Sequence, residues 1–255
     1  VAAAAIASVL GAAVLASTKF AEGVVPAGCA VNVFLVRHCD KVPPWGRHPT
    51  PENVCTTRGE MRGLEVAELF GPGGRFPTPD RIYARKFPDG AFASRDMYLL
   101  WPLERRLGLL TNTTFPDTRA GVRGLARSLL ESRAALCGEA ARRGAKESTV
   151  LIAWNHCTLT ALAQALGCRE GRCRTCWDDR DFDTVVGLRY ELSPAKLGGS
   201  SRWRLSYRRE REGISKTAES EAGFDYRECA SEDSAERDDG VPCLPPPNRS
   251  RLEFA

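Results

Sequence analysis

The feature that most constrains this fold is an apolar run at positions 33–36 that ends in Arg37 and His38. An unbroken run of branched and aromatic side chains predicts a strand buried on both faces. Open α/β sheets bind ligands at the carboxyl ends of their strands, where these two basic residues would lie. An imidazole can attack phosphorus while a guanidinium holds phosphate oxygens bidentately, so the pair is a candidate phosphoryl-transfer site.

A second apolar run, at 150–154, repeats this design and is followed by Asn155 and His156. The chain has three histidines, and two of them therefore end strand-like runs. If both strands are parallel neighbours, their exits bring His38 and His156 to one pocket. His48 lies in a loop rich in proline and glycine, and we expect it to be solvent-exposed or a substrate contact.

Apolar periodicity predicts an alternating order of strands and helices. Strands are expected at 31–36, 81–84, 109–113 and 149–154, helices at 59–70, 93–107, 118–143 and 158–167, and two late strands at 185–191 and 202–207. This order predicts an α/β three-layer sandwich with a mainly parallel sheet, helices on both faces and a late antiparallel hairpin at one edge. Thr57 and Glu60 have capping-box spacing, and Pro102 is expected to break or bend its helix.

The chain divides into three parts. Residues 1–28 are expected to be a signal peptide or an anchor-like segment, because an uncharged, alanine-rich run fits the apolar region of a secretory signal. Organelle transit is less favoured, because that run lacks arginine. Residues 29–207 are expected to form the folded domain, and 208–255 a charged, partly disordered tail. We therefore expect the secretory pathway or the extracellular space, with stable membrane contact only if the first segment is an uncleaved anchor.

Ten cysteines support an oxidising compartment. A cluster at Cys168, Cys173 and Cys176 could bind zinc, but no fourth ligand follows at the usual spacing, so disulfides are favoured and no metal is expected. Cys39 and Cys157 each directly follow a histidine. A bond between them that restrains the site is one hypothesis, and two small buried residues are the simpler interpretation. The net charge of +4 is small and scattered, which gives nucleic-acid binding little support.

Several motifs, taken in order, resemble the histidine phosphatase superfamily, also called the phosphoglycerate mutase-like family. The resemblance runs from about Val31 to Leu192. It rests on Arg37-His38, on a Thr-x-x-Gly helix start at Thr56 and Gly59 with Arg62 in place of the usual Gln, on Arg95 and on His156. The segment from Trp177 to Asp183 is similar to one in uncharacterised plant, algal and cyanobacterial members. Cys39 replaces the family's Gly or Ala. Cys157 replaces the Asp that acid phosphatase relatives carry, which disfavours that branch.

The resemblance implies a division of labour among these residues. His38 would attack phosphorus and become a phosphohistidine, while Arg37, Arg95 and His156 bind the phosphate oxygens, with no cofactor. The general acid is open among Asp117, the first choice, and Glu104 and Asp40. The expected function is a phosphomonoester hydrolase acting on a small phosphorylated substrate. The alternatives are a phosphoglycerate mutase-type phosphotransferase and a catalytically inactive secreted binding module of the same fold.

Overall fold

The computed structural model describes residues 28–40, 55–86, 94–169, 172–173, 177, 181–193 and 201–213. They form five strands and four helices. The elements in chain order are β1 (Ala30–Arg37), α1 (Thr57–Phe70), β2 (Arg81–Ala84), α2 (Arg95–Leu107), α3 (Arg119–Arg142), β3 (Glu147–Trp154), α4 (His156–Ala165), β4 (Thr184–Ser193) and β5 (Arg202–Arg211).

The strands form one mixed sheet in the order β2-β3-β1-β4-β5. Strands β2, β3 and β1 are parallel, β4 runs antiparallel to β1, and β5 pairs antiparallel with β4 at the edge. The α/β fold with a late antiparallel edge hairpin is thus confirmed. The carboxyl ends of β1 and β3 meet in register, because Arg37 pairs with Trp154.

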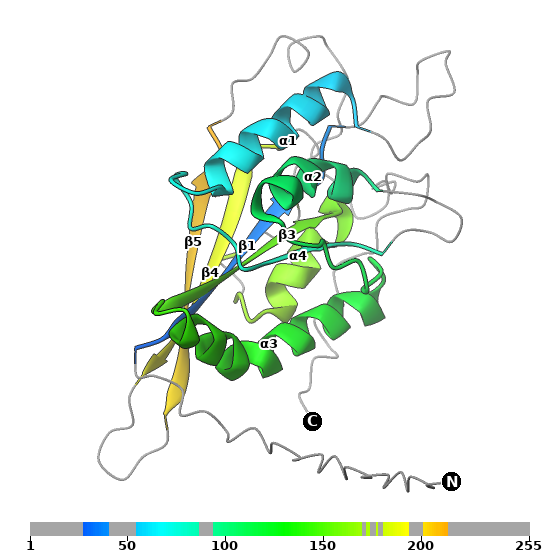
Figure 1. The fold of residues 1–255 in the computed structure, drawn as a ribbon. Coiled ribbons are helices and arrows are strands. Elements are labelled where there is room, and N and C mark those ends of the chain that lie inside the picture. Colours follow the sequence, from blue (N-terminus) through cyan, green and yellow to red (C-terminus); the bar gives the residue numbers. More distant parts are fainter. Residues whose placement is uncertain are drawn as a thin grey trace, which may run out of the picture.

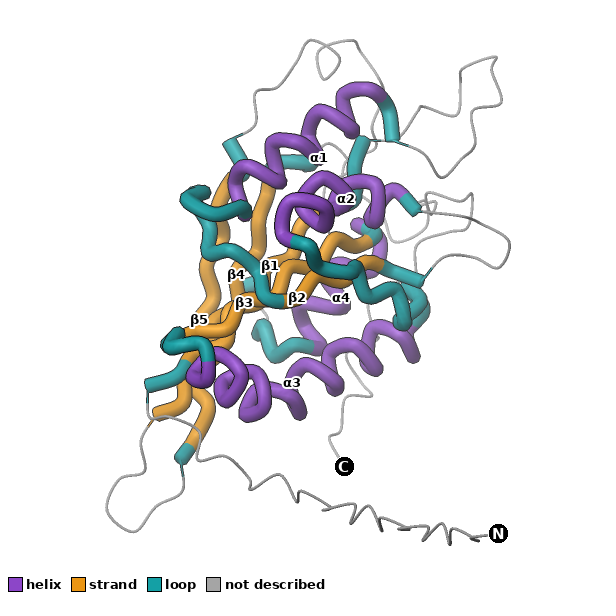
Figure 2. The backbone as a smooth tube through the Cα atoms, viewed as in Figure 1, coloured by secondary structure: helices purple, strands orange, loops and turns teal. Residues whose placement is uncertain are grey.

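Two helices cover each face of the sheet. Helices α1 and α2 lie on one side, and α3 and α4 lie on the other (Figures 1 and 2). Alternate residues of β1 divide between the two layers: Val33 and Leu35 pack toward the α3–α4 side, while Phe34 and Val36 pack toward the α1–α2 side. Strand β1 is buried along its whole length, as its unbroken apolar run predicts.

The expected strand at 109–113 is wrong. Only Asn112 makes a bridge, to Tyr83, and Leu110 is 88% exposed. The backbone N–H of Leu109 donates to the carbonyl of Glu104, and the N–H of Thr111 donates to the Glu104 side chain. The backbone N–H groups of Leu109 and Thr111 are therefore bonded to Glu104 in α2 and are not available to pair with a neighbouring strand.

Three further boundaries differ from the expectations. Thr56, not Thr57, caps α1, because its side chain accepts the N–H of Gly59. Helix α2 continues through Pro102 to Leu107 instead of breaking there. Strand β5 runs to Arg211, past the strand end expected at 207, and the buried Glu212 follows it.

Some expectations fall outside the described residues: the segment 1–27, His48, Cys176, and the tail beyond 213. Within the described part of the chain, no helix combines the length and the apolar character needed to span a membrane.

Candidate active site

The exits of three parallel strands supply the candidate site. His38 directly follows β1, His156 opens α4 one residue after β3, and Arg85 directly follows β2. Asn155 separates β3 from α4 and caps the helix by accepting the N–H of Cys157. His38 is fully buried and His156 is 4% exposed, so both rings lie within the folded structure.

The two histidine rings contact each other directly. His38 Nε2 lies 3.3 Å from His156 Nδ1, and the ring centroids are 5.6 Å apart. On its other side, His38 Nδ1 lies 2.6 Å from the carbonyl oxygen of Cys39. A carbonyl can only accept, so Nδ1 carries a proton, and in the neutral ring Nε2 then holds the lone pair. Nε2 is thus the ring nitrogen of His38 that faces His156.

The close approach of α1 fixes the turn after His38. A Cβ on Gly59 would lie 3.0 Å from Cys39 Cβ and from the Asp40 backbone, so any larger residue would have to push these neighbours away. The N–H of Thr56 also donates to the carbonyl of Asp40. The Thr-x-x-Gly pattern therefore has a direct physical reason, since it lets the first turn of α1 pack onto the residues that follow His38.

Arg37 and Arg95, the two expected phosphate ligands, are both buried, at 1% and 2% exposure. The Arg37 guanidinium stacks on the ring of Phe182, with 3.8 Å from Cζ to the centroid. Arg95 is the first residue of α2, which Ser94 caps. Cys55 Sγ lies 3.8 Å from the Arg95 carbonyl oxygen. Strand β1 and helix α2 thus each bring one buried arginine into this region.

The expected general acid, Asp117, contacts Asn155, the residue before His156. Its Oδ2 accepts from Asn155 Nδ2 at 3.0 Å and from Arg85 Nη1 at 3.1 Å, and its side chain is 16% exposed. Arg85 Nε also donates to Asp96, the residue after Arg95, at 2.6 Å. Arg85 therefore links the expected acid to the helix that carries the second arginine.

The other two candidate acids lie in different places. Glu104 accepts from the N–H and the hydroxyl of Thr111 at the far end of α2, away from the helix start that carries Arg95. Asp40 follows Cys39 and forms a long ion pair with Arg58, 3.9 Å between Oδ1 and Nε. Its Oδ2 is buried and has no hydrogen-bond partner among the described residues. Asp117 thus contacts the residue before His156 and Asp40 lies two residues after His38, whereas Glu104 lies at the far end of α2.

Sequence reasoning missed four residues of this region: Arg62, Arg85, Phe182 and Glu212. Arg85 carries the same signal as His38, a polar residue at the end of an apolar strand. In the sequence, Arg62 stands out only as a replacement for Gln, and Glu212 lies in the segment expected to be the tail.

Three disulfides join described cysteines: Cys29–Cys137, Cys39–Cys55 and Cys168–Cys173. The hypothesis of a bond between Cys39 and Cys157 is wrong, because Cys39 is bonded to Cys55. Within the described ranges, no group of three His, Cys, Asp or Glu residues is placed to hold a metal.

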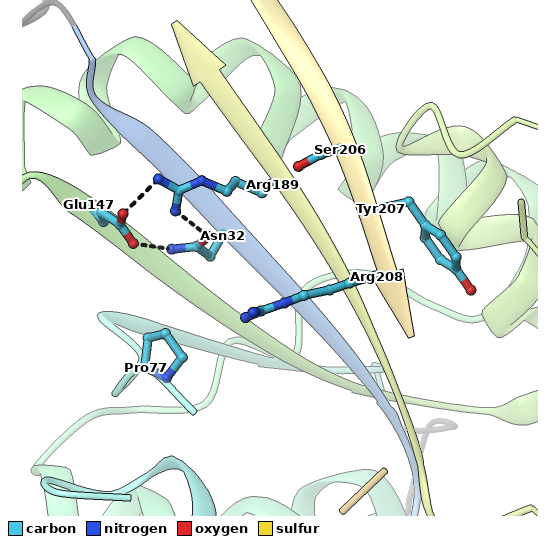
Figure 3. Close-up of a pocket in the computed structure, with 7 residues that line it drawn as sticks. All are labelled: Asn32, Pro77, Glu147, Arg189, Ser206, Tyr207 and Arg208. Carbon is cyan, nitrogen blue, oxygen red and sulfur yellow. Dashed lines mark hydrogen bonds and ion pairs between the residues drawn. The ribbon is translucent and has the colours of Figure 1, made fainter. Parts of the chain in front are cut away.

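A second polar region lies at the opposite end of the sheet (Figure 3). There Arg189 donates to Glu147 and to Asn32, and Asn32 also donates to Glu147. Arg208 lines the same pocket and pairs with Glu210. Asn32 and Glu147 lie near the starts of β1 and β3, so this pocket is separate from the two histidines. Its charged groups satisfy one another.

Comparison with solved structures finds chains with limited likeness to this one. A mycobacterial glucosyl-3-phosphoglycerate phosphatase is 14% identical, with a TM-score of 0.41 over 69% of this chain and 97% of its own. A mycobacterial hydrolase is 16% identical (TM-score 0.40, 69% and 89%). An Agrobacterium tumefaciens protein assigned as the phosphohistidine phosphatase SixA is 14% identical (0.39, 69% and 96%). No family model and no curated protein matches the chain. These TM-scores are low and carry no functional inference, which depends on the site residues alone.

Proposed function

We propose that this protein is a phosphomonoester hydrolase that acts through a phosphohistidine on His38. The observation that carries the proposal is the pairing of His38 with His156, in which Nδ1 donates to a carbonyl and Nε2 faces the second histidine. In its neutral form, an imidazole held in this orientation is a nucleophile for phosphorus. We also propose that the chain is related to the uncharacterised plant, algal and cyanobacterial members of the histidine phosphatase superfamily, which the segment around Trp177 resembles.

In the proposed reaction, His38 Nε2 forms a bond to phosphorus as the bond from phosphorus to the ester oxygen breaks. Arg37, Arg95 and His156 stabilise the negative charge on the equatorial oxygens. The leaving oxygen takes a proton from Asp117. Water then attacks the phosphohistidine, returns a proton to Asp117 and releases inorganic phosphate with His38 regenerated.

A hydrolase is favoured over a mutase by the short connection after Arg95. Helix α2 ends at Leu107 and α3 begins at Arg119, which leaves no room there for a long segment that closes over the pocket. A mutase must shield its phosphohistidine from water. The inactive binding module is disfavoured because Arg37, His38, Arg95 and His156, the residues that the proposed chemistry needs, are all present in the chain.

The test is hydrolysis of p-nitrophenyl phosphate by the wild type and by His38→Ala and His156→Ala. We expect His38→Ala to abolish turnover. Interconversion of phosphoglycerates without net hydrolysis would favour the mutase, and no activity on a panel of phosphate esters would favour the binding module.

We also propose that the protein matures in the secretory pathway. The three disulfides support an oxidising compartment, because such bonds are rare in the cytosol. Mass spectrometry of unreduced protein from its native source tests this: alkylation of all ten cysteines without prior reduction would contradict it.

A further inference from the structure

A buried ion pair contacts the backbone of His38, the proposed nucleophile. Arg62, on α1, is 4% exposed and Glu212, just after β5, is 2% exposed. Arg62 Nε donates to Glu212 Oε2 at 2.8 Å, and Nη2 donates to Oε1 at 2.6 Å. This bidentate contact fixes the plane of the guanidinium, since its two parallel hydrogen bonds allow little rotation.

The remaining arm of the guanidinium points at the end of β1. Arg62 Nη1 donates to the carbonyl oxygen of Arg37 at 3.1 Å and to that of His38 at 2.9 Å. These carbonyls belong to the residues that carry the proposed phosphate ligand and the proposed nucleophile. Arg62 therefore restrains the backbone from which both side chains project.

Glu212 is itself held in place by the antiparallel strands. Its N–H donates to the carbonyl of Asp183 at 2.7 Å, and Arg75 donates to its carbonyl at 2.8 Å. Asp183 follows Phe182, whose ring lies 5.9 Å from Arg62 Cζ and covers Arg37. The open end of the β4–β5 hairpin is thus connected to the site through the Glu212 carboxylate and through the ring of Phe182.

Such a pair is a poor device for stability alone. Burial raises the pKa of Glu212 above its usual value, and the charge and hydrogen bonds of Arg62 offset this only in part. Breaking a buried pair is costly, but replacing both partners with apolar residues is often neutral or stabilising. The geometry indicates a positional role. Two nitrogens of the Arg62 guanidinium bind Glu212, and the third binds the carbonyls of Arg37 and His38, so α1 and the residue after β5 are both tied to the end of β1.

We propose that Arg62 and Glu212 are positioning residues that hold the β1 exit, so that His38 Nε2 faces the phosphate and Nδ1 stays on the Cys39 carbonyl. This inference rests on the proposed function for its catalytic consequence. Its structural consequence, the fixed tautomer of His38, can be measured without any turnover.

The experiment compares Arg62→Met, Arg62→Lys and the double variant Arg62→Met/Glu212→Met. The control is Arg81→Met, which breaks a half-buried pair with Glu139 at the start of β2. For each protein, kcat and KM are measured on p-nitrophenyl phosphate, and the stability is measured in urea. Imidazole ¹⁵N spectra then report the tautomer of His38, and only three histidines contribute to them.

We expect Arg62→Met to lower kcat about 10- to 100-fold with KM nearly unchanged, since small misplacements of a reacting group have effects of this size. Its His38 signals should move from a single tautomer toward an average of two. The double variant should recover stability but neither kcat nor the tautomer, and Arg62→Lys should recover part of both. Arg81→Met should keep wild-type kcat and spectra.

A folded Arg62→Met with wild-type kcat and an unchanged His38 tautomer would overturn the inference. Recovery of kcat together with stability in the double variant would also overturn it, because the pair would then be merely structural. If the wild type itself hydrolyses no phosphate ester, the proposed function fails, and the tautomer measurement alone decides the positioning role.

Discussion

Removing the Cys39–Cys55 disulfide separates what this bond contributes to stability from what it contributes to the site. Both sulfurs are buried, Cys39 follows the proposed nucleophile, and Cys55 Sγ contacts the carbonyl of Arg95. The bond closes a loop with a sequence separation of 16. Chain entropy gives such a loop a stabilisation of about 3 kcal/mol. The double variant Cys39→Ala/Cys55→Ala should lose this amount and also lower kcat roughly tenfold or more, because the peptide after His38 is released.

The matched control is Cys29→Ala/Cys137→Ala. That bond has a sequence separation of 108, so the same relation gives about 4.7 kcal/mol. It joins the residue before β1 to α3, away from His38. Urea unfolding, with free energies extrapolated to water, should therefore show the larger loss of stability for the 29–137 variant. The loss of kcat on p-nitrophenyl phosphate should instead be larger for the 39–55 variant. Equal losses of kcat in both pairs, or no loss in the 39–55 pair, would refute this reasoning.

Three further variants test single contacts. Asp117→Asn should slow alkyl phosphates about 100-fold and p-nitrophenyl phosphate far less, because only the former needs a proton on the leaving oxygen; equal slowing would remove Asp117 as the acid. Phe182→Leu should raise KM about 2- to 5-fold through loss of the ring over Arg37, and an unchanged KM would argue against that contact. Burial raises the pKa of Tyr190, whose hydroxyl donates to Leu166. The phenol therefore contributes stability below its unfolded pKa of about 10 and loses it as pH rises further. In urea unfolding, Tyr190→Phe should be about 1 kcal/mol less stable than the wild type at pH 8, and this difference should shrink above pH 10. A difference that does not change with pH would contradict a stabilising role for the buried Tyr190 hydroxyl.

The sequence predicted those parts of the site that share one local signal. His38 and His156 follow apolar runs buried on both faces, and such runs predict both the strand and the position of its exit. Arg95 follows a serine that caps a helix start, so its place could also be inferred. Parallel pairing of β1 with β3 then accounts for the meeting of the histidines.

The residues that support the site carry no such signal. Glu212 directly follows a strand in which arginines alternate with partly buried Trp203, Leu205 and Tyr207, and the charges concealed the strand's length. Arg62 is a charged residue on a helix, and its burial depends on Glu212, which is distant in the sequence. The partner of Cys39 depends on where α1 packs, and spacing does not encode it. Contacts between distant elements decide all three.

The most direct test of the central claim is rapid quenching of the enzyme during turnover of a phosphate ester, followed by peptide mass spectrometry under alkaline conditions that preserve phosphohistidine. The account predicts one phosphoryl group on the peptide that contains His38, and no phosphoryl group on the His156 peptide or in His38→Ala. Hydrolysis that proceeds in His38→Ala, or in the wild type with no phosphorylated His38 during turnover, would contradict it.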